Sequence, residues 1–242
     1  MLKASNTLIK DLKKQKRENS SLLFLDNFKI IKDALKSGLK PTCILLEDEN
    51  KNIFKDYSCP IYKVDSKTIE QLADSKTPQG VVCILKYTQN IVELPKTNFL
   101  VLDSLQDPGN VGTLIRTALA CSFDYVYLLD CVKPTNSKLI RSSVGAIFNT
   151  KVIPMGKSDF INFAKQNQLK LIATDMEGEN IFNYNNTEQI GLVIGNEGQG
   201  VSDEIMEICY KRVKIPMNPG IESLNASISG AIIMYQINKD NI

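Results

Sequence analysis

Short apolar runs alternate with segments of helical periodicity along the chain. In the first part, apolar residues recur at helical spacing from Phe28 to Leu35, and Gly38 follows, which predicts a helix that ends at the glycine. An apolar run at 22–25 precedes this helix. A shorter helix is expected near 66–73, with strands at 42–46, 61–64 and 81–85. The pattern predicts a small α/β domain over residues 1–86.

Longer elements follow a stretch at 87–98 that has little pattern and a proline at position 95, and we interpret this stretch as a linker. Strands are expected at 99–103, 125–129, 152–153, 171–173 and 192–194. Helices are expected to carry residues 111–119, 140–147, 160–164 and 224–235, with Ser137 and Ser202 as candidate N-caps. Continuous apolar strands between helices are typical of a parallel sheet covered on both faces. The predicted fold class is α/β, with a parallel-sheet domain over 99–242.

Composition excludes several kinds of site. The 242 residues include no histidine, so a Ser-His-Asp triad, a Cys-His pair and a histidine-ligated zinc site are impossible. The six cysteines form no Cys-x-x-Cys pair, so we expect no metal cluster but reduced thiols in a cytoplasmic protein. Because no apolar run approaches the roughly 18 residues of a membrane helix and the N-terminus lacks a signal-peptide pattern, no membrane association is expected.

Charge is distributed unevenly. The formal net charge is +2, yet residues 1–40 carry ten Lys/Arg against four Asp/Glu. The cations that follow each other most closely in this segment are Lys10, Lys13, Lys14, Lys16 and Arg17. They are typical either of a solvated helix face or of a surface that contacts phosphates, and the sequence leaves both open.

The first candidate motif is Asp107-Pro108-Gly109-Asn110-Val111-Gly112, with Arg116 in the helix that it opens. It follows an apolar strand, and ligands of open α/β sheets bind at the carboxyl ends of strands. With Asn110 as the N-cap, Arg116 points away from the apolar helix face and is free to reach a phosphate. A plain turn explains the same residues.

Two further motifs follow strands or open helices. The run Gly195-Asn196-Glu197-Gly198-Gln199-Gly200 matches neither the dinucleotide fingerprint nor the phosphate loop, so it predicts a sharply bent backbone whose carboxylate suits a cationic partner. The run from Ile215 to Ser227 places Ser223 and Asn225 where they either hold a ligand or cap the last helix. In that helix Ala226, Ser229 and Gly230 form a small-residue face, suited to packing within the chain or between subunits.

Together the three motifs resemble the SpoU/TrmH family of RNA ribose 2′-O-methyltransferases, within the SPOUT class. The family pattern D-P-x-N-x-G-x-x-x-R, G-x-E-G-x-G and I-P-M-x-x-x-x-E/D-S-L-N-x-S is matched in order by Asp107–Arg116, Gly195–Gly200 and Ile215–Ser227. Residues 1–86 resemble the RNA-substrate-binding domain of this family, including Pro78-Gln79-Gly80-Val81-Val82. There the sequence departs from the family, because Leu25-Asp26-Asn27 replaces a V-E-G turn.

The resemblance implies S-adenosylmethionine as cofactor, no metal, a trefoil knot in the second domain and a homodimer that completes the active site between subunits. It implies these catalytic residues: Asn110, Arg116, Glu197, Ser223 and Asn225. It implies these cofactor-binding residues: Thr174, Gly195, Asn196, Glu197, Gly198, Ile215, Met217, Ser223, Leu224 and Asn225. We interpret Arg116 as a clamp on the target phosphate rather than as a base, because the guanidinium pKa exceeds about 12.

The N-terminal domain favours ribosomal RNA, of the 23S type, as substrate. The alternatives are a tRNA 2′-O-methyltransferase and a non-catalytic RNA-binding or ribosome assembly factor. A housekeeping methylase and one that confers drug resistance would have the same sequence features.

Overall fold

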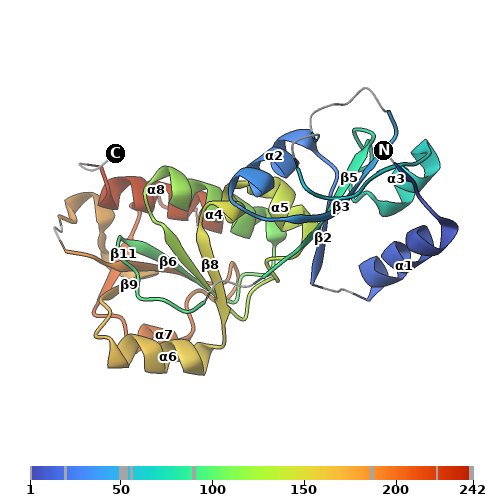
Figure 1. Ribbon diagram of the computed structural model, residues 1–242. Coiled ribbons are helices and arrows are strands. Elements are labelled where there is room, and N and C mark those ends of the chain that lie inside the picture. The colour runs from blue at the N-terminus through green and yellow to red at the C-terminus, as the bar shows by residue number, and fades with distance from the viewer. Residues whose placement is uncertain are drawn as a thin grey trace. The chain divides into compact units, whose positions relative to one another are not determined.

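The computed structural model describes residues 2–18, 21–48, 54, 57–88, 91–185, 188–221 and 223–239. The chain divides into two compact units, Met1–Thr88 and Gln89–Ile242, so the division lies just after the expected end of the first domain. Each unit is built around its own sheet (Figure 1).

The described residues of the first unit form a five-stranded sheet of order β1-β4-β3-β5-β2. Its strands are β1 (Leu2–Lys3), β2 (Leu22–Leu25), β3 (Pro41–Leu46), β4 (Ile61–Lys63) and β5 (Val81–Lys86). Strand β5 runs antiparallel to β2 and β3, whereas the other pairs are parallel. The helices are α1 (Asn6–Arg17), α2 (Phe28–Lys36) and α3 (Ser66–Leu72). The predicted α/β unit is therefore observed, with a mixed sheet.

The departure at Leu25-Asp26-Asn27 has a structural explanation. Asn27 is the N-cap of α2, and its Oδ1 accepts the N–H groups of Lys29 and Ile30 at 3.0 and 3.2 Å. Asp26 is 5% exposed, and its Oδ2 accepts the N–H groups of Asp74 and Ser75 at 2.8 and 2.7 Å. These residues therefore start α2 and tie β2 to the segment after α3.

The basic run in α1 does not behave as one surface. Lys16 Nζ donates to the carbonyl oxygens of Leu72 and Ala73 at 2.6 and 2.8 Å and pairs with Asp74 Oδ1 at 2.8 Å. Lys16 thus fastens α1 to the end of α3. By contrast, Lys10, Lys14 and Arg17 are exposed to solvent.

The described residues of the second unit form a six-stranded sheet of order β11-β9-β10-β6-β7-β8, and every pairing in it is parallel, as predicted. Its strands are β6 (Phe99–Asp103), β7 (Tyr125–Leu129), β8 (Lys151–Met155), β9 (Leu171–Asn180), β10 (Gly191–Ile194) and β11 (Lys211–Lys214). The helices are α4 (Pro108–Ala120), α5 (Ser137–Ser142), α6 (Lys157–Gln166), α7 (Asp203–Met206) and α8 (Ala226–Ile237). Helices α6 and α7 cover one face, and α4 and α8 cover the other (Figure 1).

Three local expectations were wrong. Helix α4 begins at Pro108 with Asp107 rather than Asn110 as N-cap, because the Asp107 carboxylate accepts the Asn110 N–H at 3.1 Å and a proline needs no partner in the first helical turn. Asn136 rather than Ser137 caps α5. That helix also stops at Ser142, because the left-handed φ of +51° at Val144 and +83° at Gly145 breaks it.

The second half of the expected linker is bound to the second unit. Tyr127 donates its hydroxyl to the Glu93 carbonyl oxygen at 2.7 Å, and Gln189 Nε2 donates to the carbonyl oxygens of Pro95 and Thr97 at 2.8 and 2.6 Å. The Glu93 carboxylate also pairs with Lys151. Residues 89–90 of this stretch lie outside the described residues.

Candidate functional site

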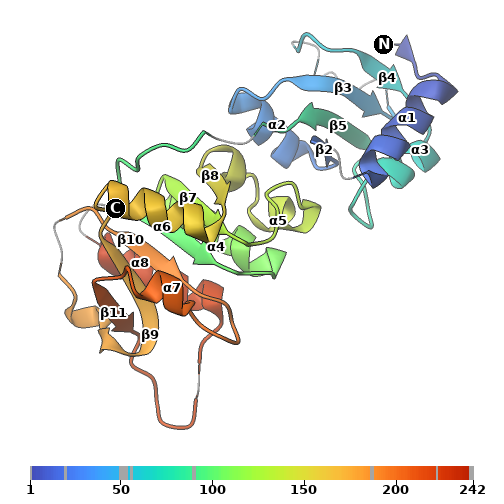
Figure 2. The same cartoon turned by 90° about the horizontal axis from the view of Figure 1, so that it is seen from below.

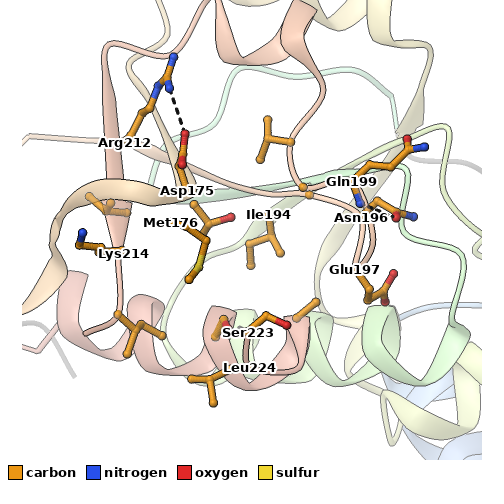
Figure 3. A pocket seen from close by; sticks show the side chains of 18 of the residues that line it. Asp175, Met176, Ile194, Asn196, Glu197, Gln199, Arg212, Lys214, Ser223 and Leu224 are labelled. Carbon is orange, nitrogen blue, oxygen red and sulfur yellow. Dashed lines mark hydrogen bonds and ion pairs between the residues drawn. The ribbon is translucent and has the colours of Figure 1, made fainter. Parts of the chain in front are cut away.

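A cavity of about 590 Å³ lies in the second unit, at the carboxyl ends of β10 and β11 and beside the point where β9 leaves its pairing with β11 (Figure 3). Its walls come from the middle of β9, the turn after β10, α7, β11 with the segment that follows it, and α8. The segment after β11 projects as a long loop from the body of the unit (Figure 2). The cavity therefore sits at the carboxyl edge of a parallel sheet, where such folds bind ligands.

Strand β9 contributes to the cavity through an irregular pairing. β11 pairs with Ala173 and then, one residue further along, with Glu179, so residues 174–178 leave the ladder. Gly178 makes this possible, because a Cβ there would lie 2.5 Å from the Val213 nitrogen. Sequence periodicity predicted only the regular first part of β9.

The turn after β10 is held in one shape by its own backbone. Asn196 and Gly200 exchange two N–H···O bonds of 2.9 and 2.8 Å, and the Asn196 Oδ1 accepts the Gly198 N–H at 2.9 Å. Gly200 has a φ of +72°, and a Cβ on Gly195 would lie 2.1 Å from the Gly200 carbonyl carbon. Glycine at these two positions is thus required by conformation and by close backbone approach.

Side chains from all three motifs meet beside the cavity. Asn110 Nδ2 donates to Glu197 Oε1 at 2.7 Å, and Asn225 Nδ2 donates to Asn110 Oδ1 at 3.0 Å. Asn225 is also the N-cap of α8, where its Oδ1 accepts the N–H groups of Ser227 and Ile228 at 2.9 and 3.3 Å. Because a carboxylate only accepts hydrogen bonds, the network fixes the orientation of both amides.

Charges of both signs border the cavity. Arg212 and Lys214 lie on one side, where Arg212 Nη1 pairs with Asp175 Oδ2 at 3.1 Å, and Asn196 and Glu197 lie on the other (Figure 3). Within the described part of the chain, Glu197 forms no ion pair. An unpaired carboxylate beside a cavity attracts a cationic group of a ligand.

The structure brings most of the predicted site residues together. Of the ten expected cofactor-binding residues, all but Asn225 line the cavity. Asn225 lies beside it and donates a hydrogen bond to Asn110. Arg116 is exposed on α4, and among the described residues it neither lines the cavity nor forms a side-chain hydrogen bond or ion pair. Glu222, in the third motif, lies outside the described residues.

Sequence reasoning missed several lining residues. Asp175, Met176 and Gln199 border the cavity, as do Arg212 and Lys214. Arg212 is one of only four arginines, and this scarcity could have marked it as a candidate site residue. It was passed over because it lies outside the three motifs. Nothing in the sequence pattern indicated Asp175, because only the irregular pairing of β9 with β11 brings it to the cavity.

Of the three small residues on one face of α8, Ala226 and Ser229 line the cavity, and Gly230 packs within the chain. A Cβ on Gly230 would lie 2.4 Å from both Ile194 Cδ1 and Leu114 Cδ2. This close approach brings α8 against α4 and β10, so Gly230 serves intramolecular packing.

Two further features concern metal ligands and membrane helices. The described residues contain no group of three or more Cys, Asp or Glu side chains that could hold a metal ion. None of the helices in the described ranges is long and apolar enough to cross a membrane.

Comparison with known proteins agrees with this geometry. The model of the SpoU rRNA Methylase family matches residues 97–235, and that of the MRM3-like substrate binding domain matches residues 6–83. The chain is 28% identical to the 23S rRNA (guanosine(2553)-2′-O)-methyltransferase RlmP of Bacillus subtilis, over 97% of both chains. It is 30% identical to an uncharacterized tRNA/rRNA methyltransferase of Synechocystis, over 96% of this chain and 90% of the relative.

Solved structures show the same fold. An AdoMet-bound rRNA methyltransferase from Sinorhizobium meliloti superposes with a TM-score of 0.87 at 23% identity, covering 100% of this chain and 98% of the other. With one family model spanning more than half of the sequence, the chain belongs to the SpoU rRNA methylase family.

Proposed function

We propose that this protein transfers the methyl group of S-adenosylmethionine to a ribose 2′-hydroxyl of 23S ribosomal RNA. The observation that carries the proposal is the convergence of Asn110, Glu197 and Asn225, one from each motif, beside a cavity at the carboxyl edge of the sheet. Membership of an rRNA methylase family and the RlmP relative, matched along almost its whole length, support it.

The residues of the cavity fit S-adenosylmethionine. A volume of about 590 Å³ lies in the range of ligand pockets, about 300–1,000 Å³. Ile194, Leu224 and Ile233 offer apolar contacts, and the glycine turn offers backbone groups. The cofactor is a sulfonium cation with an amino-acid end, which suits lining groups of both charges. When bound, it supplies the electrophilic methyl group.

The protein's own residues then act on the ribose hydroxyl, a poor nucleophile that must be oriented and that loses its proton to water as the oxygen–methyl bond forms and the sulfur–methyl bond breaks. Asn110 and Asn225 hold Glu197 and the start of α8 in fixed positions, and Ser223 offers a hydroxyl at the cavity. Arg116 grips the target phosphate and stabilises the developing alkoxide, because its planar fork binds two oxygens at once.

A homodimer explains how Arg116 takes part although it lies outside the cavity of its own chain. Helix α8 is apolar on both sides, a feature of helices buried all round. Ile228 and Tyr235 nevertheless remain 50% and 49% exposed in the single chain. Pairing of two copies through this side of α8 would cover them.

We also infer that the second unit is knotted. The order β11-β9-β10 means that the chain leaves β10, crosses to the far side of β9 and returns to α8 against β10 and α4. This path supports the trefoil knot that the family resemblance implies. The cytoplasm is the proposed compartment, since all six cysteines are free thiols and the RlmP relative is a bacterial rRNA enzyme.

The first unit supplies RNA affinity. It matches a substrate-binding domain model, and α1 presents Lys10, Lys14 and Arg17 to solvent. Lys16 is not part of this surface, because its ammonium group is bound to the Leu72 carbonyl oxygen and the Asp74 carboxylate.

The test is methylation of purified 23S ribosomal RNA and of tRNA by the full chain with labelled S-adenosylmethionine, followed by mass mapping of ribose methylation. We expect one methylated nucleotide in 23S ribosomal RNA. Methylation of tRNA alone would establish the tRNA alternative. Absence of cofactor binding in a calorimetric titration, with and without RNA, would favour the non-catalytic factor.

A further inference from the structure

Asp103, the last residue of β6, is a buried carboxylate outside the three motifs. It is 1% exposed. Its Oδ2 accepts both the N–H and the hydroxyl of Ser202 at 2.7 Å, and its Oδ1 lies 3.0 Å from Lys157 Nζ and 3.1 Å from Ser104 Oγ. Burial raises the pKa of Asp103, but the hydrogen bonds from Ser202 and Lys157 outweigh burial and hold the pKa below its ordinary value. Asp103 is therefore an anion at neutral pH.

Ser202 follows the glycine turn and lies between two residues of the cavity wall, Val201 and Asp203. It stands at the N-cap position of α7, where a serine side chain ordinarily accepts an N–H of the helix. Here its hydroxyl donates to Asp103 instead. The sequence-based expectation that Ser202 caps the helix with its side chain is thus replaced by a bond to β6.

The opposite end of the turn is held by the neighbour of Asp103. Asn196 Nδ2 donates to the Ser104 carbonyl oxygen at 3.1 Å, and Ser104 itself has a left-handed φ of +61°. The carboxyl end of β6 therefore contacts both ends of the turn between β10 and α7. The turn's backbone lines the cavity between these two attachments.

We propose that Asp103 is a positioning residue for the cofactor: through Ser202 it holds the segment Gly195–Val201 in the shape that binds S-adenosylmethionine, with Lys157 as its counter-ion. This inference rests on the proposed function. It predicts that Asp103 acts on cofactor affinity beyond its contribution to folding.

Asp26 provides a matched control. It is also buried, and its carboxylate also accepts two N–H bonds of 2.8 and 2.7 Å, but it belongs to the first unit. Asp103→Asn and Asp26→Asn are the same substitution at a buried carboxyl group that accepts two hydrogen bonds, although Asp103 also faces Lys157. Only Asp103 contacts the turn between β10 and α7 that lines the cavity.

The experiment measures melting temperature, the Kd for S-adenosylmethionine, and kcat and KM for RNA methylation with the full chain. Asp103→Asn should raise the Kd and KM for S-adenosylmethionine about tenfold or more, the scale of losing hydrogen bonds to a charged group, with a smaller change of kcat at saturating cofactor. Asp26→Asn should lower the melting temperature without changing the Kd for S-adenosylmethionine.

If Asp103→Asn does not fold, variants of Ser202 test the inference instead. Ser202→Ala removes one bond to Asp103 and should weaken cofactor binding roughly threefold, while Ser202→Thr keeps the hydroxyl and should bind more tightly than Ser202→Ala. A Kd within twofold of wild type in Asp103→Asn, or in Ser202→Ala where it alone folds, would overturn the inference. Failure of the wild-type chain to bind S-adenosylmethionine would instead overturn the proposed function, and the inference with it.

Discussion

Asn110 Nδ2 lies 2.7 Å from Glu197 Oε1, although 87 residues separate the two in the chain. The Asn110 side-chain oxygen in turn accepts a hydrogen bond from Asn225. One amide thus ties the glycine turn after β10 to the N-terminus of α8. It does so without a charge of its own, which leaves the Glu197 carboxylate available to a cationic ligand.

Replacing Asn110 with aspartate should be more harmful at neutral pH than replacing it with alanine. Asn110→Asp places two carboxylates in direct contact, whereas Asn110→Ala only removes the donor. We expect turnover to fall roughly 100-fold in Asn110→Ala, the scale of losing one preorganised donor, and further in Asn110→Asp. Lower pH should partly rescue only Asn110→Asp, because two adjacent carboxylates can share a proton. Parallel pH profiles of turnover in the two variants would contradict this role.

Arg116→Lys keeps the charge but loses the planar fork. Turnover should fall roughly 100-fold or more, while the Kd for S-adenosylmethionine hardly moves, since Arg116 lies outside the cavity lining. Folding should be preserved because the side chain is exposed. Single-turnover methylation beside cofactor titration measures both effects. Normal turnover would reduce Arg116 to a surface residue, and lost cofactor binding would indicate a structural role.

The exposed cations of α1 should determine the salt dependence of RNA binding. Neutralising Lys10, Lys14 and Arg17 with glutamine should weaken RNA binding and flatten the slope of log K against log salt by roughly 0.7–0.9 for each phosphate that the protein no longer neutralises. Lys16→Gln is the control, because Lys16 bonds to Leu72 and Ala73 and should affect stability more than the slope. An unchanged slope in the triple variant would identify these residues as ordinary solvated surface.

The exposed side of α8 should form the dimer contact. Ile228→Lys and Tyr235→Lys should shift the chain from dimer to monomer in sedimentation experiments, and methylation should disappear with the dimer. Leu94→Lys alters another half-exposed apolar side chain and should leave the dimer intact. A fully active 27.0 kDa wild-type monomer at micromolar concentration would refute the pairing.

Acid should remove the stabilisation that Asp103 provides. Its pKa is lower in the folded chain than its ordinary value, so its contribution is fully present above the ordinary pKa of about 4 and is lost as pH falls through the folded value. The difference in free energy of unfolding between wild type and Asp103→Asn should therefore be largest at pH 5 and above and shrink at pH 3. Lys157 faces Asp103 and stays protonated throughout, with Glu204 3.7 Å beyond it. Denaturant unfolding at each pH measures the difference, and a constant difference would contradict it.

Much of the fold could be predicted from local pattern. Strands such as Phe99–Asp103 and Gly191–Ile194 are buried on both faces, so they appear as unbroken apolar runs that only a covered parallel sheet accommodates. Helix ends were less certain, because Asp107 and Asn110 are both good caps three residues apart, and the choice depends on which side chain reaches a free N–H. The end of α5 was missed because a left-handed valine gives little signal in composition.

The sequence by itself determined most strands of the two sheets, the three motifs and the residue types that a methyl-transfer site needs, because each of these depends on neighbours within a few positions. It missed the edge strands β1 and β11, which are short and carry lysine or arginine at most positions, so they show no apolar run. The tertiary structure alone decided which distant residues meet. It placed Asp175 on the cavity through an irregular pairing of β9, engaged Lys16 with α3 and left Arg116 outside the cavity of its own chain. It also joined Asp103 to Ser202 across 99 residues. Such contacts depend on strand order and backbone path, which no local periodicity encodes.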